Sequence, residues 1–159
     1  MSPPSPPSAP DLSIDTARGD DRDEIRVLLE EVGLDVPARF DEDRSSFRVL
    51  RADDRIGGVV ALSAFGPVAL LHSLAVHPEV QGRGYAQSLI LDVEAHGRAQ
   101  GVRAVYLFTD AEAGFFRCFG YRAIDPEAVP PDVARTPTVQ DTDEGATCMW
   151  KQLGTSGFA

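Results

Sequence analysis

The sequence predicts an α/β fold made of one domain, and three observations support this prediction. The chain has 159 residues, which is enough to bury one hydrophobic core of ordinary size. Apolar runs of strand length alternate along the chain with segments whose apolar residues recur at helical spacing. The apolar run at residues 68–76 leads through a pair of glycines into a helical pattern of Tyr85, Leu89, Ile90 and Val93.

The first half of the chain is predicted to contain four strands and one helix. Leu12–Thr16 alternates in polarity, which is typical of a strand. Asp20 or Asp21 can cap a helix with one apolar face, and Gly33 ends that helix. The other strands of this half are predicted at residues 47–50, 56–65 and 68–76, with turns at 53–55 and 66–67.

The second half is predicted to contain a long helix, a short helix and three strands. The long helix runs from Gly84 to about Gln100, and Gly101 closes it. Thr109 or Asp110 caps a short helix that ends before Gly120. Three prolines within residues 126–135 indicate short helical turns, and the strands are predicted at residues 102–109, 121–124 and 147–153.

Composition separates the domain from its ends. Residues 1–11 are rich in Pro and Ser, and we expect them to be disordered because they cannot bury enough apolar surface to fold. The domain is expected to occupy residues 12–153. Residues 154–159 are expected to form a flexible tail.

Charge and composition argue against several classes of function. The 25 acidic residues outnumber the 15 basic ones, and the net charge of -10 disfavours nucleic acid and anionic membranes as partners. Two cysteines, Cys118 and Cys148, are too few for a disulfide framework, and no metal-binding signature is present. No apolar run is long enough to span a membrane, and no signal-peptide pattern is found. We therefore expect a cytoplasmic protein without a metal.

The segment after residue 76 is suited to bind an anion. It contains the string Gln81-Gly82-Arg83-Gly84, and its glycines permit backbone angles that a Cβ would disfavour. A glycine loop that leads into a helix directs free N–H groups and the positive end of the helix dipole at one point, where a phosphate fits. The loop is no P-loop, because no Gly-Lys-Ser/Thr follows, and it lacks the third glycine of a dinucleotide-binding fingerprint. An ordinary strand-to-helix turn remains the alternative.

The longer string from Leu74 to Ala86 resembles the acetyl-CoA-binding segment of the GCN5-related N-acetyltransferases, the GNAT superfamily. The family motif is Gln/Arg-x-x-Gly-x-Gly/Ala, and residues 81–86 match every defined position. The resemblance covers roughly residues 12–152. It implies a mixed, mostly antiparallel sheet with helices on both faces, in which the central strand splays away from the strand after the long helix.

The resemblance also implies where the co-substrate acetyl-CoA binds. The backbone of Leu74, Ala75 and Val76 would face the pantetheine arm in the splayed gap, much as an added strand would. Backbone amides of the loop and of the first helical turn would hold the pyrophosphate. The residues concerned are Gln81, Gly82, Arg83, Gly84, Tyr85, Ala86 and Gln87.

The second family landmark, commonly Phe-Tyr-x-x-x-Gly-Phe, departs from the pattern here. Its tyrosine protonates the leaving CoA thiolate in the family, and this chain has Phe116 at that position, within the expected cofactor site. Either another group supplies the proton or the thiolate leaves without one, since a thiol is acidic enough for this near neutral pH. The substitutes that remain open are Tyr106, Tyr121 and Cys118.

Acetylation of an amine also needs a group that removes a proton, because an alkylamine is mostly ammonium at pH 7. His72 and Ser73 on the central strand are the catalytic candidates, and His77 at its end is expected to be structural. Because neighbours in a strand point to opposite faces, at most one of His72 and Ser73 is expected to face the substrate. In the family the connection near Arg39 and Phe40 helps to wall the acceptor site, which makes both residues candidates for that wall.

Residues 68–76, 105–109 and 114–117 resemble one subfamily more closely, the arsenic-resistance-type N-acetyltransferases. Members of that group also tend to have Gly-Phe-Phe in place of Phe-Tyr. The resemblance implies detoxification of a small arsenic-containing or amino-acid-like compound. The chain has Gln140-Asp141-Thr142-Asp143 where a further cysteine is expected before Cys148, which disfavours a thiolate site for arsenic.

Together these observations predict an acetyl-CoA-dependent N-acetyltransferase that acetylates a small primary amine by direct attack, without an acyl-enzyme. Its partners would be that small molecule and a second copy of the chain, because dimerisation is common in the family. The alternatives are a CoA-binding or sensor module that lacks catalysis, an arsenic-responsive protein that uses Cys118 and Cys148, and a protein N-acetyltransferase.

Overall fold

The computed structural model describes residues 11–37, 40–41, 46–140 and 145–154. The predicted disorder of residues 1–11 and the predicted flexible tail lie outside these ranges, apart from Asp11 and Gly154. The described strands are β1 (Leu12–Thr16), β2 (Phe47–Ala52), β3 (Arg55–Phe65), β4 (Val68–Val76), β5 (Ala104–Thr109), β6 (Arg122–Ala123) and β7 (Thr147–Gln152). The described α-helices are α1 (Arg22–Glu31), α2 (Tyr85–Ala99), α3 (Ala113–Arg117), α4 (Pro131–Ala134) and α5 (Pro137–Gln140).

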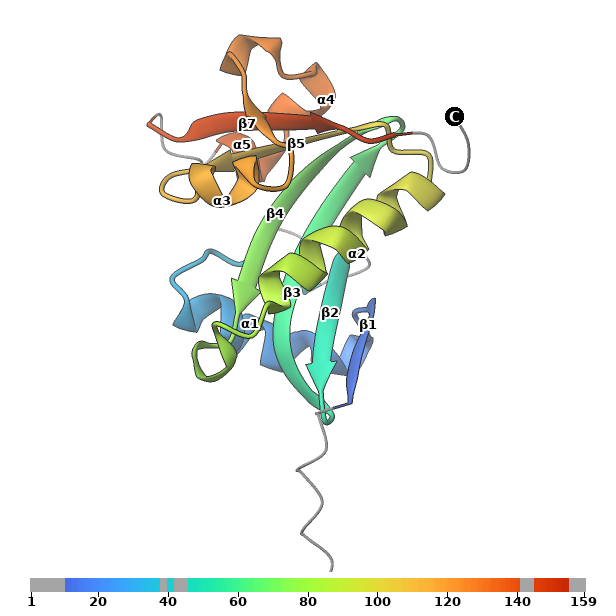
Figure 1. Ribbon diagram of the computed structural model, residues 1–159, viewed down its shortest axis with the longest axis vertical. Coiled ribbons are helices and arrows are strands. Elements are labelled where there is room, and N and C mark those ends of the chain that lie inside the picture. Colours follow the sequence, from blue (N-terminus) through green and yellow to red (C-terminus); the bar gives the residue numbers. More distant parts are fainter. Residues whose placement is uncertain (1–10, 38–39, 42–45, 141–144, 155–159) are drawn as a thin grey trace, which may run out of the picture.

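The described strands form one mixed sheet in the order β1-β2-β3-β4-β5-β7-β6 (Figure 1). Neighbouring strands are antiparallel except β4 and β5, which are parallel. The pairing of β4 with β5 covers only Val68–Leu70 against Ala104–Tyr106, and Figure 1 shows the two strands diverging beyond it. The predicted mixed, mostly antiparallel sheet with a splayed gap is therefore confirmed.

Helices cover both faces of the sheet because the strands are apolar on both sides. Val60 and Leu62 of β3 pack in the core cluster that includes α2, whereas Val59 and Ala61 pack with α1 on the other face. Figure 1 shows α2 lying along the first of these faces. The alternation within one strand thus builds two cores.

The long helix begins and ends at glycines, close to where the sequence predicts. Gly84 precedes α2 with φ +80°, and Gly101 follows it with φ +94°. The N–H of Val102 donates to Gly97 O at 2.9 Å, which closes the C-terminus in the manner of a glycine cap. Because this cap occupies the residues that follow α2, β5 begins at Ala104, two residues later than predicted.

A buried polar cluster joins α2 to the C-terminal part of the sheet. Glu94 on α2 is 2% exposed, and it accepts hydrogen bonds from the Tyr121 hydroxyl at 2.9 Å and from Lys151 Nζ at 2.9 Å. Burial, followed by the charge and the hydrogen bond of Glu94, raises the pKa of Tyr121.

No described helix is long and apolar enough to cross a membrane. The helical turn α5 was not predicted from the sequence.

Candidate active site

The gap between β4 and β5 opens into a cavity of about 820 Å³. Its walls come from residues 71–76 of β4, residues 107–109 of β5, residues 81–82 and 84–87, the region of α3, and Val32 and Leu34 after α1. Since β5 pairs with β4 only as far as Leu70, the edge of β4 that borders the cavity has no partner in β5. An extended ligand can therefore pair with this edge as an added strand would.

The glycine loop presents N–H groups to this cavity. The first hydrogen bond of the helix runs from Ser88 N–H to Gly84 O at 3.1 Å, so the N–H groups of Tyr85, Ala86 and Gln87 lie before it and have no partner within the helix. Gly82 and Gly84 both have positive φ, and a Cβ added to either would meet no protein atom within 4 Å. Their conformation, and not close packing, is what requires glycine.

Ser73 adopts a left-handed backbone conformation with φ +57° in the middle of β4. The pairing of β3 with β4 shifts here, from Val59–Ala75 to Ala61–His72. The irregularity is a β-bulge, which interrupts the alternation of side chains. The two side chains therefore do not point in opposite directions as a regular strand predicts, because Ser73 Oγ lies 2.9 Å from His72 Nδ1 and both residues line the cavity.

The imidazole of His72 lies between two serine hydroxyls. Its Nδ1 is 2.9 Å from Ser73 Oγ, and its Nε2 is 3.0 Å from Ser63 Oγ on β3. Phe47 packs edge-on against the ring. Burial lowers the pKa of His72 to about 4, so the ring is neutral near pH 7. Ser63 was not predicted as a site residue, although pairing residues 56–65 with 68–76 around the turn at 66–67 would have placed it near His72.

The predicted cofactor residues gather around this cavity with one exception. Those that line it are Leu74, Ala75, Val76, Gln81, Gly82, Gly84, Tyr85, Ala86, Gln87 and Phe116. Arg83 instead lines a second cavity of about 440 Å³ between α1, the β2–β3 turn and the loop after β4.

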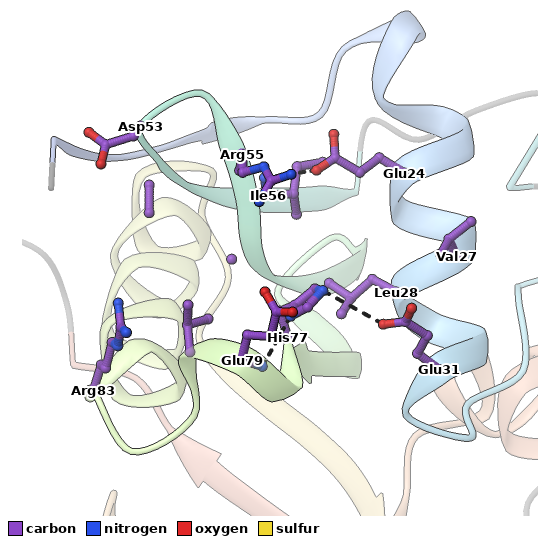
Figure 2. Close-up of a pocket in the computed structure, with 13 residues that line it drawn as sticks. Glu24, Val27, Leu28, Glu31, Asp53, Arg55, Ile56, His77, Glu79 and Arg83 are labelled. Atoms are coloured by element: carbon purple, nitrogen blue, oxygen red, sulfur yellow. Dashed lines mark hydrogen bonds and ion pairs between the residues drawn. The ribbon is translucent and has the colours of Figure 1, made fainter.

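Figure 2 shows this second cavity, with Arg83 at one side and His77 near its centre. His77 Nδ1 accepts a hydrogen bond from Glu79 N–H at 3.1 Å, and its Nε2 lies 3.7 Å from a carboxylate oxygen of Glu31. The contact with Glu31 links the end of β4 to α1, which agrees with the structural role expected of His77.

The three suggested replacements for the missing tyrosine lie elsewhere. Tyr106 stacks on Trp150, the Tyr121 hydroxyl donates a hydrogen bond to Glu94, and Cys118 is exposed after α3. None of the three lines the cavity. Phe116 is 6% exposed and packs against Phe115 with its ring edge-on.

Of the two residues predicted for the acceptor wall, the structure describes only Phe40. Phe40 is 1% exposed and packs against Phe47, so it supports the core next to His72 and does not line the cavity. Arg39 lies outside the described residues.

Comparison with known proteins places the chain in a family. Residues 15–121, more than half of the chain, match the family model described as the acetyltransferase (GNAT) family. An amino-acid acetyltransferase from Ectopseudomonas mendocina (strain ymp) is 29% identical over 112 residues, which make up 67% of this chain and 26% of that protein. The chain thus spans about a quarter of the length of this curated relative.

Solved structures share the fold. N-acetylglutamate synthase from Neisseria gonorrhoeae, complexed with coenzyme A and N-acetyl-glutamate, is similar with a TM-score of 0.80 at 22% identity, over 90% of this chain and 35% of that one. Rv2747 from Mycobacterium tuberculosis, solved in complex with CoA, has a TM-score of 0.76 at 19% identity, over 89% of this chain and 99% of that one. On the match to the family model, and with this fold, the chain belongs to the GNAT acetyltransferase family, whose members use acetyl-CoA.

Proposed function

We propose that this chain transfers the acetyl group of acetyl-CoA to a small primary amine by direct attack of the amine on the thioester. One observation carries the proposal: the unpaired edge of β4, the glycine loop and the His72–Ser73 pair border the same cavity. In this arrangement backbone groups alone can hold a ligand. Its reactive end then lies beside His72 and Ser73, whose side chains can accept or donate a proton.

The cofactor would be held mainly by the backbone. The pantetheine arm would pair with residues 74–76 in the gap between β4 and β5. The pyrophosphate would accept hydrogen bonds from the N–H groups at the start of α2, where the helix dipole also favours an anion.

The reaction would proceed without an acyl-enzyme. Cys118 is exposed and Cys148 is buried, and neither lines the cavity. Burial, and to a smaller extent the charge of Asp125, raises the pKa of Cys148 to about 11, which keeps its thiol protonated. The positions of the two cysteines and the raised pKa of Cys148 disfavour a cysteine nucleophile. They also disfavour the alternative in which the two thiolates bind trivalent arsenic.

An amino acid or a related amine is the acceptor class that we favour. The curated relative is named for amino-acid acetylation. Among the described residues that line the cavity, Glu112 is the only carboxylate, and none is a lysine or an arginine. Because no described cation lines the cavity, the carboxylate of an amino-acid acceptor would have to be held by neutral hydrogen-bond donors. An arsenic-containing amino acid belongs to the same acceptor class, so a role in arsenic resistance is the narrower form of this proposal.

The test begins with thermal melting of the purified chain with and without acetyl-CoA. Cofactor at a hundred times its dissociation constant adds about 2.7 kcal/mol to the free energy of unfolding, which raises the melting temperature measurably. Thiol release is then followed with a panel of amino acids, diamines and a short peptide. We expect a melting shift and release with at least one free amine.

Each other result would indicate a different function for this chain. A melting shift without release for any amine would identify a binding or sensor module. Release with the peptide alone would identify a protein N-acetyltransferase. A folded sample without a melting shift would mean that the glycine loop is only a turn, and the proposal would be wrong.

A further inference from the structure

Three polar side chains form a continuous path from the cavity through β4 to β3. Ser73 lines the cavity, its Oγ lies 2.9 Å from His72 Nδ1, and His72 Nε2 lies 3.0 Å from Ser63 Oγ. Ser63 does not line the cavity and is half-buried at the far end of the path. One end of the path therefore meets the reactants, and the other end can exchange a proton with water.

The middle member of this path cannot easily act as a base by itself. A neutral imidazole carries one N–H and one lone pair, so it can take a proton at Nδ1 only by becoming a cation or by losing the proton at Nε2. Burial lowers the pKa of His72 to about 4, which makes the cation costly. Ser63 offers a way to avoid the cation, because its oxygen lies within hydrogen-bond distance of Nε2.

We propose that Ser63, His72 and Ser73 act as one proton relay, which removes a proton from the attacking amine nitrogen and later returns it to the sulfur of CoA. Ser73 is the member that would touch the reactants, and Ser63 is a positioning residue that acts through His72. The inference rests on the proposed acetyltransferase function and names the groups that would move the proton in it.

The steps balance as follows for a neutral amine. The nitrogen lone pair forms the C–N bond to the acetyl carbon, and the resulting cationic nitrogen gives a proton to Ser73 Oγ. The Ser73 hydroxyl proton passes to His72 Nδ1, the Nε2 proton passes to Ser63, and the Ser63 hydroxyl proton passes to water. The C–S bond then breaks and its electron pair leaves on sulfur.

The same path operated in reverse completes the reaction. Water returns a proton to Ser63, Ser63 passes one to Nε2, Nδ1 returns its proton to Ser73, and Ser73 protonates the thiolate. The imidazole regains its first tautomer without having become a cation, and the products are the amide and CoA thiol. A relay of this kind supplies the proton that Phe116, at the family's tyrosine position, cannot supply.

The kinetic test uses Ser63→Ala, Ser63→Thr and the matched control Ser13→Ala, whose serine is exposed on β1. Thiol release is measured with acetyl-CoA and the panel amine that the wild-type chain acetylates fastest. We expect Ser63→Ala to lower kcat by roughly 100-fold, the lower end for loss of one proton-transfer group. We expect the KM for acetyl-CoA to stay within about 2-fold, Ser63→Thr to retain most of the activity through its hydroxyl, and the control to match the wild-type chain.

A second measurement needs no substrate. The nitrogen-15 shifts of the His72 ring report its tautomer, which we expect to be Nε2–H in the wild-type chain and to change toward Nδ1–H in Ser63→Ala, because Nε2 then loses its acceptor.

These readouts separate the relay from a structural role. Equal kcat values in Ser63→Ala and the control, equal losses in Ser63→Ala and Ser63→Thr, or an unchanged tautomer in Ser63→Ala would each overturn the relay. A wild-type chain that acetylates no amine would overturn the proposed function, and with it the relay, even where the tautomer shifts as expected.

Discussion

Ser73 combines an unusual backbone conformation with a position at the cavity. Left-handed φ costs an L-residue roughly 1–2 kcal/mol, and such strain persists only where the surrounding structure imposes it. Here β3 and β4 pair on both sides of the bulge and hold Ser73 in place. The result is that two consecutive side chains, His72 and Ser73, border one cavity and contact each other, which a regular strand does not allow.

At Gly84, we predict that substitution by valine abolishes acetyl-CoA binding. The added side chain would extend into the open space beside the first turn of α2, where the pyrophosphate is expected, and the positive φ would be strained as well. Gly66→Val is the matched control, because Gly66 also has a positive φ with no atom within 4 Å but lies in the β3–β4 turn. Calorimetric titration with acetyl-CoA should show binding to the control alone, and equal affinities would contradict the assignment of the loop to the pyrophosphate.

At the scale of elements, the hairpin of β3 and β4 shows what the sequence could and could not predict. The bounds of β4 and the turn at Gly66 follow directly from the apolar run and the Gly-Pro pair. The bulge at Ser73 did not follow, because serine carries no local signal for left-handed φ, and tertiary pairing decides it. Ser63 was overlooked for a different reason, since its importance depends on a partner nine positions away across the hairpin.

The contacts between α2 and β7 give a prediction for stability. Glu94→Ala would leave Lys151, whose side chain is 21% exposed, without its carboxylate, and it would remove the acceptor of the Tyr121 hydroxyl. We expect the free energy of unfolding in urea to fall by about 3 kcal/mol, the lower end for a broken buried pair, because Lys151 keeps some contact with water. Glu30→Ala, at an exposed position of α1, should change it by less than about 0.5 kcal/mol.

A double variant checks the cause of this loss. Glu94→Leu combined with Lys151→Met replaces the ion pair by apolar groups, and we expect it to recover part of the lost stability because no charge is then left unpaired. A double variant as unstable as Glu94→Ala would show that the loss of the acceptor of the Tyr121 hydroxyl, and not the unpaired charge, dominates.

For the whole molecule, the sequence predicted the architecture more completely than the chemistry. Strands with apolar residues on both sides required helices on both faces, and the structure confirms α1 on one and α2 on the other. The glycine loop and the splayed gap followed from the family resemblance. Hairpin pairing could have brought Ser63 near His72, but the contact between His72 and Ser73 depends on the bulge, which no spacing in the sequence encodes.

The last prediction concerns the pH dependence of stability, to which His72 contributes with a definite sign. Its pKa is lowered by burial from 6.5 to about 4 in the folded chain. Above pH 6.5 the ring is neutral in both states, so it does not change stability. Between pH 6.5 and 4 only the unfolded chain takes up the proton, so the folded state loses stability as the pH falls, and below about pH 4 the loss levels off. A shift of this size corresponds to about 3 kcal/mol.

Urea unfolding at pH 7 and at pH 4.5, for the wild-type chain and for His72→Gln, isolates this contribution. The many carboxylates affect both proteins alike, so the difference between their two pH dependences belongs to His72. We expect the wild-type chain to lose about 2–3 kcal/mol more than the variant over this range. Parallel pH dependences would mean that the ring is hydrated and accepts a proton readily. His72 could then act as a simple base through Ser73, and Ser63 would no longer be needed to keep it neutral.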